Sequence, residues 1–440
     1  MKIHLVGIGG IGMSGLARYF KAQGWTVSGS DAARSRMTDE LRREGMKIAS
    51  GHHKGLIRRD VGLVVYNRAI PLDNPEIREA KRLNIITLPY AKVLGGITDE
   101  YTTIAITGSH GKSTTTALAA LTLMGSKMDP TVLIGTNLKE LGGRNIRIGK
   151  SPYLVLEADD FGGAFLEYSP AYAIVTNIDR EHLDHYKNFG NLKKAFLKFL
   201  ARTRHGGTLI LNRDDENLRS LAARIKTLAK KNKLKVIWYS LRDSSTTRIK
   251  TILKIHGVHN LSNALAVHAL GKTLGIPEKK TLAALGAYNG AWRRMEYRGN
   301  LGTARVYDDY AHHPTEIKAT LQAFREKHPK NIIVCVFQPH QAKRLKTLFK
   351  EFTGAFNAAD QIILLPLYKV TGRDEKPGKF DSLGLAKAIW KRSPKQFLAY
   401  LEDPKRLKRT ILELPGPLSS KVIVMMGAGD IVNLTGSLLK

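Results

Sequence analysis

Residues 104–114 read IAITGSHGKST, and this stretch decides the fold of the middle of the chain. The apolar residues predict a buried strand, the glycines predict a tight loop, and the Lys-Ser-Thr run predicts the start of a helix. Glycines in such a loop let backbone N–H groups close around phosphate oxygens, and the helix N-terminus adds a favourable dipole. We expect Lys112 to reach the terminal phosphates of a nucleotide, and Ser113 or Thr114 to place a hydroxyl on Mg²⁺.

The spacing differs from the standard phosphate loop, which has a glycine where this chain has Ile106. A tight strand–helix turn with an incidental lysine is the structural alternative. Nucleotide binding is the better interpretation because strand, glycines, lysine and helix follow in the required order. The residues of this loop predicted to bind ATP are Gly108, Ser109, His110, Gly111, Lys112, Ser113 and Thr114.

A second glycine loop lies near the N-terminus, where residues 7–12 read GIGGIG directly after an apolar strand. Asp31 follows the next expected strand, 19 residues after Gly12. This fingerprint serves a dinucleotide or any other diphosphate, so a nicotinamide cofactor and a purely structural turn are both alternatives. A simple dehydrogenase does not need the second, ATP-type loop. The predicted diphosphate-binding residues are Gly7, Gly9, Gly10, Ile11, Gly12 and Asp31.

Acidic residues follow an apolar strand at residues 154–160, which read LVLEADD. Strand ends in open α/β sheets face the ligand crevice, and Mg²⁺ prefers a few carboxylates. We predict Glu157 as a metal ligand, with solvated loop acids as the alternative. His182, in the segment TNIDREHLD at residues 176–184, is a candidate second metal ligand, although a lone histidine is more often a capping or surface group.

Further polar residues open helices in the second half of the chain. Asn260 and Asn263 are three residues apart, so they share a helix face and could both hydrogen-bond a nucleotide; helix capping is the alternative. Arg294, beside a predicted domain boundary, could reach a transferring phosphoryl group or be one more surface arginine. Residues 308–316 read DDYAHHPTE and suit substrate binding or proton handling, whereas Pro314 at the first helical position suggests a capped helix start.

Strands and helices alternate along the whole chain, which predicts parallel sheets covered by helices. We predict three α/β domains: a Rossmann-like domain at 1–97, a central phosphate-loop domain at 98–296, and a Rossmann-like domain at 297–440. Gly95-Gly96 is a plausible linker, and residues 241–256 are expected to be irregular. The expected strands are 3–6, 26–29, 63–66, 85–88, 103–107, 153–156, 173–176, 208–211, 304–307, 332–337, 361–365, 397–400 and 422–426.

Composition limits the function classes that remain. The chain has 440 residues, 43% of them hydrophobic, which suffices for several cores. Its only cysteine, Cys335, cannot form an internal disulfide, and neither an apolar span nor the apolar core of a signal peptide occurs, so a cytoplasmic protein is expected. The net charge of +32 is spread along the chain, and aromatic residues are only 7%, which argues against specific nucleic-acid binding.

These segments together resemble the Mur ligase family over nearly the whole chain. The resemblance also uses residues 337–340, FQPH, and 427–430, GAGD; nine short motifs in one order are highly specific. The DDYAHHPTE and FQPH strings point away from the folylpolyglutamate synthase relatives. The resemblance to the Mur ligase family implies three domains that close over their substrates.

The resemblance implies an ATP-dependent ligase of peptidoglycan precursor synthesis. Such an enzyme joins an amino acid, here expected to be L-alanine, to the carboxylate of UDP-N-acetylmuramate through an acyl phosphate. The first glycine loop would then hold the UDP diphosphate. By matching motifs, the resemblance assigns Lys112 to the phosphates, Glu157 and His182 to Mg²⁺, Asn260 and Asn263 to the adenine and its phosphates, and Arg294 and Asp309 to ATP and catalysis. For the mechanism that it implies, we further predict Lys112 and His313 as catalytic residues, His340 and Arg344 as amino-acid-binding residues, and Ser113 as a third magnesium ligand. A monomer or homodimer is expected.

The sequence also departs from the family pattern near the expected substrates. Residues 157–162, EADDFG, replace the usual EADESD; residues 67–70, NRAI, replace SSAI; and Gln341 replaces an arginine. The stretch before His259 is shortened. These departures concern substrate recognition more than ATP chemistry. The alternatives are a ligase that attaches a whole peptide to the same sugar nucleotide, an NAD-dependent oxidoreductase, and a basic nucleic-acid-binding ATPase.

Overall fold

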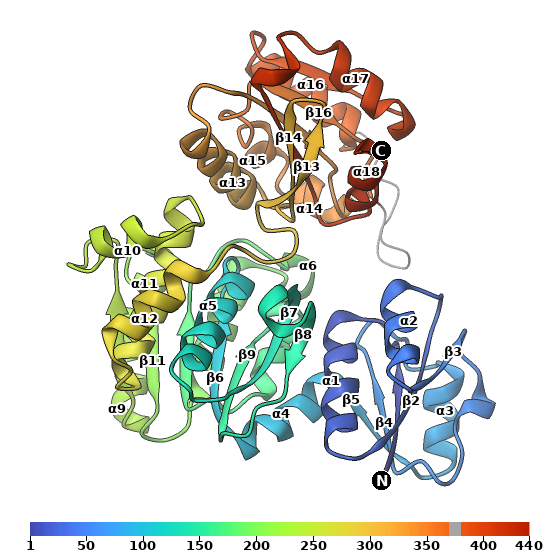
Figure 1. The fold of residues 1–440 in the computed structure, drawn as a ribbon. Coiled ribbons are helices and arrows are strands. Elements are labelled where there is room, and N and C mark those ends of the chain that lie inside the picture. Colours follow the sequence, from blue (N-terminus) through green and yellow to red (C-terminus); the bar gives the residue numbers. More distant parts are fainter. Residues whose placement is uncertain (369–379, 440) are drawn as a thin grey trace. The chain divides into compact units, whose positions relative to one another are not determined.

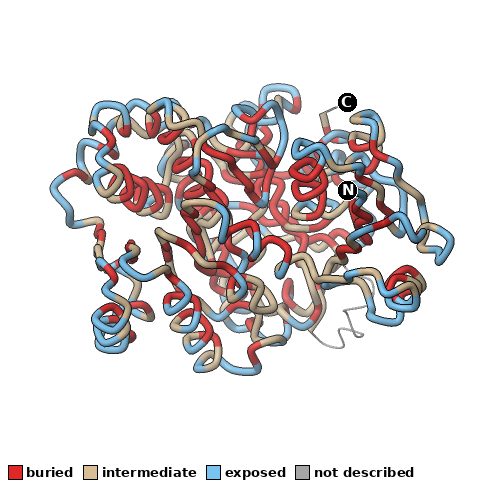
Figure 2. Tube along the Cα trace, turned by 90° about the horizontal axis from the view of Figure 1, so that it is seen from below, coloured by how far each residue is buried: buried red, intermediate tan, exposed pale blue. Residues whose placement is uncertain are grey.

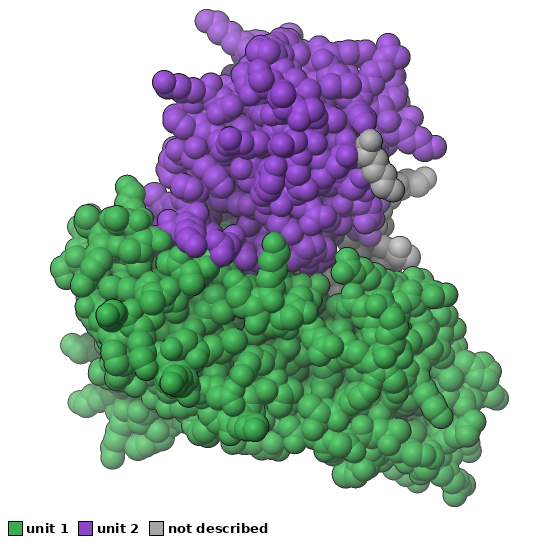
Figure 3. Space-filling view, viewed as in Figure 1, with its two compact units in different colours: residues 1–252, 262–288 green, residues 253–261, 289–440 purple. Residues whose placement is uncertain are grey.

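The computed structural model describes residues 1–368 and 380–439, and these residues form three sheets flanked by helices (Figure 1). The first two sheets lie in one compact unit, residues 1–252 with 262–288, and the third lies in a second unit, residues 253–261 with 289–440 (Figure 3). The expected class, α/β with three sheet-containing domains, is confirmed. The domain borders at 97/98 and 296/297 stay a prediction.

The first sheet has five parallel strands in the order β3-β2-β1-β4-β5. Apolar strands in its middle, such as β1, are buried on both faces, as parallel sheets require. Its elements are β1 (Lys2–Val6), α1 (Ile11–Ala22), β2 (Thr26–Asp31), α2 (Arg36–Arg43), β3 (Lys47–Ser50), the 3₁₀ helix η1 (Lys54–Leu56), β4 (Leu63–Tyr66), α3 (Pro75–Arg82), β5 (Ile86–Pro89) and α4 (Tyr90–Glu100).

The second sheet has seven strands in the order β12-β11-β10-β6-β9-β7-β8, with β8 antiparallel to β7. Its strands are β6 (Thr102–Thr107), β7 (Thr131–Leu138), β8 (Arg144–Arg147), β9 (Tyr153–Glu157), β10 (Tyr172–Val175), β11 (Thr208–Asn212) and β12 (Lys235–Tyr239). Its helices are α5 (Lys112–Gly125), η2 (Lys139–Leu141), η3 (Phe161–Glu167), α6 (Leu183–Tyr186), α7 (Phe189–Ala201), α8 (Glu216–Arg219), α9 (Ala222–Asn232), α10 (Thr246–Ile252), α11 (Val258–Thr273) and α12 (Glu278–Ala287).

The third sheet has six strands in the order β13-β14-β18-β15-β16-β17, with β13 antiparallel to β14. Its strands are β13 (Glu296–Leu301), β14 (Ala304–Asp309), β15 (Ile332–Phe337), β16 (Gln361–Leu364), β17 (Phe397–Tyr400) and β18 (Lys421–Met426). Its helices are α13 (Pro314–Lys327), α14 (Ala342–Thr347), α15 (Phe349–Thr353), α16 (Ser382–Arg392), η4 (Pro404–Arg406), α17 (Leu407–Glu413), η5 (Leu418–Ser420) and α18 (Ile431–Leu438).

Buried residues concentrate along the strands and on the inner faces of the helices (Figure 2). In the first unit, one hydrophobic core runs from the first sheet into the second, from Ile3 to Leu234. In the second unit, separate cores cover the two faces of the third sheet. Among the described residues, none of the helices is both long and apolar enough to cross a membrane.

The first two sheets are joined by close packing of α1 against β7 and β8. A Cβ atom on Gly15 would lie 2.4 Å from a methyl carbon of Leu133, so only glycine fits at this crossing. The buried Arg18 pairs with Glu44 at 2.9 Å and donates to the amide oxygen of Asn145 at 3.1 Å. Asn145 lies on β8, so a buried polar contact adds to the apolar packing.

Some expectations from the sequence are wrong. Gly95 and Gly96 lie inside helix α4 instead of forming a linker, because Gly95 packs closely on the backbone carbonyl of Glu167. The stretch at 241–256, expected to be irregular, contains helix α10. The strands β3, β7, β8, β12 and β13 were not predicted.

Candidate functional site

The predicted phosphate loop connects β6 to α5, and two of its glycines allow close approach by neighbouring residues. Gly108 has a φ of +140°, and a Cβ atom there would lie 2.1 Å from the hydroxyl of Thr176. Gly111 has a φ of +82°, and a Cβ atom there would lie 2.5 Å from the amide oxygen of Asn263. Both positions therefore require glycine, for backbone conformation and for space.

Asn177, which follows β10, holds the loop in shape. Its side-chain oxygen accepts a hydrogen bond from the backbone N–H of His110 at 2.8 Å, and its amide nitrogen donates to the carbonyl of His110 at 3.0 Å. Its own carbonyl accepts from the N–H of Ser109 at 3.2 Å. The sequence places Asn177 at a strand end, but it was not among the predicted site residues, since nothing in the pattern shows which loop it faces.

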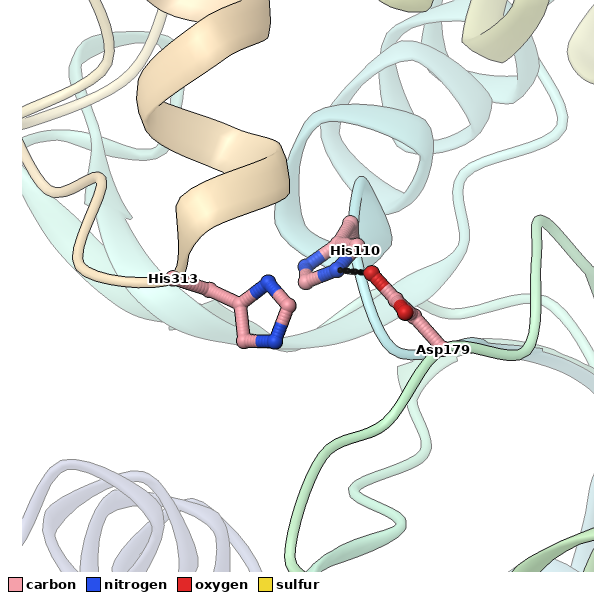
Figure 4. Close-up of side chains that lie close together, drawn as sticks. All are labelled: His110, Asp179 and His313. Atoms are coloured by element: carbon pink, nitrogen blue, oxygen red, sulfur yellow. Dashed lines mark hydrogen bonds and ion pairs between the residues drawn. The ribbon is translucent and has the colours of Figure 1, made fainter. Parts of the chain in front are cut away.

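Asp179 makes a further contact with the same loop. Its carboxylate lies 2.8 Å from Nε2 of His110 (Figure 4), and its backbone N–H donates to the hydroxyl of Ser109 at 2.8 Å. Segment 176–179 therefore positions both middle residues of the loop. Ser109 and His110 thus contact this segment through both their backbone atoms and their side chains.

Lys112, the first residue of α5, folds back over the loop. Its ammonium group donates to the carbonyls of Gly108 at 2.7 Å and Ser109 at 3.3 Å, and it pairs with Asp160 at 2.8 Å. Burial opposes the charge, but the carboxylates of Asp160, Asp159 and Glu157 outweigh it and raise the pKa of Lys112. The lysine is thus a fixed cation at the N-terminus of a helix, where phosphate oxygens bind favourably.

Carboxylates gather beside this lysine, at the end of β9. Glu157 accepts from the hydroxyl of Ser113 at 2.9 Å and from the N–H of Gly135 at 2.7 Å. The ligand atoms of Asp159, Asp160 and His182 lie within 4.8 Å of one another. The structure thus brings Ser113 and Glu157 together, and groups the imidazole of His182 with the two aspartates.

Asp160 was not predicted as a site residue, yet it is completely buried beside Lys112. One of its oxygens pairs with the lysine, and the other, Oδ2, is buried without a hydrogen-bond partner among the described residues. Burying a carboxylate oxygen without a partner is unfavourable. A cation bound here would satisfy it.

The first glycine loop forms between β1 and α1 as expected. The N–H groups of Gly7 and Ile8 donate to the carbonyl of Ser30 at 2.9 and 3.0 Å, and the N–H of Gly9 donates to the carboxylate of Asp31 at 2.8 Å. Asp31 therefore fixes the loop directly, whatever else it binds.

Gly10, Ile11 and Gly12 start helix α1. Gly10 occupies the N-cap position, and a Cβ atom there would lie 3.1 Å from the amide nitrogen of Asn67. At Gly12 a Cβ atom would lie 2.9 Å from the ring of Tyr90. The loop leaves no room for side chains, which suits close approach of a diphosphate to the helix N-terminus.

Asn260 and Asn263 both lie on α11 and are buried, as the spacing predicts for one face. The amide of Asn260 donates to the carbonyl of His256 at 2.7 Å. The amide nitrogen of Asn263 is buried beside Gly111 and has no hydrogen-bond partner among residues 1–368 and 380–439. Asn263 is therefore the better placed of the two to meet a nucleotide on the phosphate loop.

In the second unit, Asp309 ends β14 and its carboxylate is buried. It accepts hydrogen bonds from the N–H groups of Ala311 at 2.8 Å and Met295 at 2.9 Å. Burial raises the pKa of Asp309, and Arg294 is the largest opposing influence. The guanidinium of Arg294 lies over the ring of Tyr310, at 5.1 Å from its centroid. The structure thus places Arg294 and Asp309 in one electrostatic group.

The neighbouring Arg293, which the sequence did not single out, is buried. Its guanidinium donates to the carbonyls of Gly427 and, at 3.2 Å, Gly429, and burial lowers its pKa. It connects the loop before β13 to the GAGD segment that follows β18, so its role is to hold the chain around Arg294.

His313, a predicted catalytic residue of the second unit, has a structural role at the start of a helix. His313 caps helix α13: its Nδ1 accepts from the N–H of Thr315 at 3.2 Å, and Glu316 completes a capping box. The capped start with Pro314 at the first position, which the sequence left open, is what the structure shows. His313 precedes its helix in Figure 4.

His340 stacks on Tyr368 at a ring-centroid distance of 5.5 Å, and Arg344 lies 3.5 Å from Nδ1 of His340. Gln341 has a φ of +67° and is the N-cap residue of α14. The two predicted amino-acid-binding residues are therefore in contact with each other.

The site thus consists of a tight phosphate loop with a fixed lysine, a carboxylate cluster beside it, and a second glycine loop in the same unit. Among α/β proteins, these features define an enzyme that binds a nucleoside triphosphate and a second diphosphate-bearing molecule. The nicotinamide alternative accounts for only one of the two loops.

Comparison with known proteins gives the family. Three family models match in order: Mur ligase family, catalytic domain, at residues 2–102; Mur ligase middle domain at 106–271; and Mur ligase, glutamate ligase domain, at 293–437. The chain belongs to the Mur ligase family. The predicted resemblance is therefore confirmed.

Individual relatives match over nearly their whole length. UDP-N-acetylmuramate–L-alanine ligase of Acetivibrio thermocellus is 39% identical, with 100% of this chain and 95% of that protein aligned. The ligase of the same name from Aquifex aeolicus is 35% identical, covering 100% and 97%. The crystal structure of the UDP-N-acetylmuramate–alanine ligase of Thermotoga maritima matches with a TM-score of 0.80 at 28% identity, covering 100% and 98%.

Proposed function

We propose that this chain is an ATP-dependent ligase that joins UDP-N-acetylmuramate to L-alanine in peptidoglycan precursor synthesis. The carrying observation is the phosphate loop with Lys112 held against Asp160, in a chain that aligns end to end with ligases of that name. ATP and the two organic substrates are its small-molecule partners. The reaction belongs in the cytoplasm, where ATP is supplied.

In the proposed reaction, a carboxylate oxygen of the sugar nucleotide attacks the γ-phosphorus of ATP. The bond to the β-phosphate oxygen breaks, and ADP leaves. The amine of the amino acid then attacks the acyl carbon, phosphate departs with the electron pair of the C–O bond, and the amine loses a proton. The protein supplies position and charge more than covalent chemistry.

Different residues of the first unit bind ATP and the sugar nucleotide. Lys112 and the N-terminus of α5 bind the β- and γ-phosphates, and Asn263 donates its buried amide to the nucleotide. The loop at residues 7–12 binds the UDP diphosphate at the N-terminus of α1, which begins at Ile11. These assignments follow from the shape of the two loops.

The donors beside Lys112 fit a magnesium ion. Ser113, Glu157, Asp159 and Asp160 offer hard oxygens, His182 adds one nitrogen, and Asp160 has a buried oxygen without a partner among the described residues. When bound, the ion would neutralise charge on the phosphates. We propose Ser113, Glu157 and His182 as its ligands.

Arg294 and Asp309 are proposed to act on ATP, and His313 in catalysis. His340 and Arg344 are proposed to receive the amino acid. The contact between His340 and Arg344 supports a shared role for these two polar side chains.

The test is release of inorganic phosphate by the purified protein with ATP, Mg²⁺ and UDP-N-acetylmuramate. The co-substrates are L-alanine, glycine, L-serine and an L-alanyl tripeptide, each in a separate reaction. Turnover that is fastest with L-alanine and gives the amide product supports the proposal. Preference for the tripeptide would make the chain a peptide ligase, and no turnover with any amine would refute the assignment.

A further inference from the structure

The loop after β4, residues 67–70, forms one wall of the first glycine loop. The N–H of Asn67 donates to the carbonyl of Val6 at 3.2 Å. The side chain of Ile70 would lie 3.3 Å from a Cβ atom on Gly7, and that of Asn67 3.1 Å from one on Gly10. Any group bound by the glycine loop therefore lies beside this segment.

Arg68 extends from this wall to the second sheet of the same unit. Its Nη1 donates to the carbonyl of Gly162, and its Nη2 lies 3.1 Å from Nδ1 of His185. The guanidinium carbon is 5.7 Å from the centroid of the Phe161 ring, within range of a cation–π contact. One side chain therefore connects the glycine-loop wall with the segment that follows Asp160.

Gly162 is adapted to this contact. Its φ is +67°, and a Cβ atom there would lie only 1.6 Å from Nη1 of Arg68. Arg68 and Gly162 are 94 residues apart in the sequence, and with Phe161 they form one local arrangement.

The charge of Arg68 is not neutralised by this arrangement. A carbonyl, an imidazole and an aromatic ring are neutral partners, and no carboxylate of the described residues forms an ion pair with it. Burial, and then the nearby guanidinium, lower the pKa of His185, so its imidazole is neutral and can accept the hydrogen bond. A guanidinium held by neutral acceptors exchanges them readily for a charged oxygen, which binds it more strongly.

We propose that Arg68 binds an oxyanion of the acidic sugar nucleotide, either its diphosphate or its sugar carboxylate, and releases Gly162 and His185 when it does so. This inference rests on the proposed function, in which the substrate extends from the glycine loop toward Lys112. Arg68 lies between these two ends, because Phe161 and Gly162 directly follow the Asp160 that pairs with Lys112. The planar fork of arginine suits bidentate binding of either oxyanion.

Calorimetric titration without ATP tests this directly. The ligands are UDP, UDP-N-acetylglucosamine and UDP-N-acetylmuramate, of which only the last carries a carboxylate. The proteins are wild type, Arg68→Ala, Arg68→Lys, and Arg78→Ala as the matched control, since Arg78 is an exposed arginine on α3 of the same sheet. Circular dichroism melting establishes that each variant is folded.

We expect Arg68→Ala to bind UDP-N-acetylmuramate about tenfold or more weakly, because a hydrogen bond to a charged group is lost. Arg68→Lys should recover part of this, and Arg78→Ala should match wild type. Equal weakening for UDP identifies the diphosphate as the bound group, whereas weakening for UDP-N-acetylmuramate alone identifies the carboxylate. The KM for ATP should stay within about twofold of wild type, which a merely structural role for Arg68 would not predict.

Two other outcomes are distinct from each other. If wild type and Arg68→Ala bind all three ligands equally, the role of Arg68 is refuted and the proposed ligase function is untouched. If wild type binds none of the uridine nucleotides, both the proposed function and the role of Arg68 fall.

Discussion

Replacing Lys112 by alanine removes the cation that folds back over the phosphate loop. The ammonium group lies within 2.7–3.3 Å of two loop carbonyls and 2.8 Å from Asp160, so its position is fixed before ATP binds. Loss of one preorganised group that stabilises developing charge reduces kcat by roughly 10²–10³-fold, or about 3–4 kcal/mol. We therefore expect Lys112→Ala to retain at most about one hundredth of the wild-type rate.

The same change also affects stability, and this effect must be separated. Asp160 is completely buried, so removing its cation leaves an uncompensated carboxylate at a cost of up to roughly 3–5 kcal/mol. The double variant Lys112→Ala with Asp160→Asn removes both charges. We expect it to recover most of the melting temperature lost in the single variant and to remain inactive.

The assay is initial release of ADP and of amide product, measured together by chromatography at saturating UDP-N-acetylmuramate and L-alanine. Lys112→Arg retains the charge with a different shape and should restore little activity, because the loop leaves a narrow position for the cation. Near-wild-type rates in a folded Lys112→Ala or double variant would refute the phosphate-loop assignment.

Two further changes test the site and the fold. Gly108→Ala should abolish ATP binding measured by calorimetry while UDP binding persists, because its Cβ atom would lie 2.1 Å from the Thr176 hydroxyl at a φ of +140°; ATP affinity like that of wild type would contradict this view of the loop. Burial raises the pKa of Asp215, the N-cap of α8, to about 6. Between about pH 4 and 6, the carboxyl group is therefore protonated in the folded state and ionised in the unfolded state. The stability that this group contributes is therefore present at low pH and lost as the pH rises through 6. As the pH rises from 4 to 7, the free energy of unfolding of Asp215→Asn should increase relative to that of wild type by on the order of 2 kcal/mol. Melting temperatures of the two proteins that change in parallel with pH would rule this out.

The sequence predicted the inner part of each sheet better than its margins. Inner strands such as β15 and β18 contain long continuous apolar runs, because both their faces are buried. Four of the five strands that were not predicted, β3, β8, β12 and β13, lie at sheet edges. Three of these, β3, β8 and β13, have charged or polar residues at or near their ends, so no apolar run marks them as strands, whereas β12 has the apolar residues VIWY and was missed although its sequence offered that signal.

The site was predicted only as far as local motifs extend. Lys112 and Gly111 follow from a pattern within one loop, and their positions agree with that pattern. Asp160 and Asn177 hold this loop from other segments, and their roles depend on which strands are neighbours: β6 lies between β9 and β10. Strand order is a property of the folded chain that spacing along the sequence does not encode.

The Gly15 crossing has a consequence for substrate choice. Because α1 packs on β7 and β8, with the Arg18–Asn145 contact beside it, the two proposed ligand loops lie in one compact unit. If the two loops bind their ligands as proposed, their separation sets the substrate length: a sugar nucleotide whose acid is too near to its diphosphate, or too far from it, cannot present that acid to the triphosphate. Selection by length would precede any recognition of chemical groups along the way.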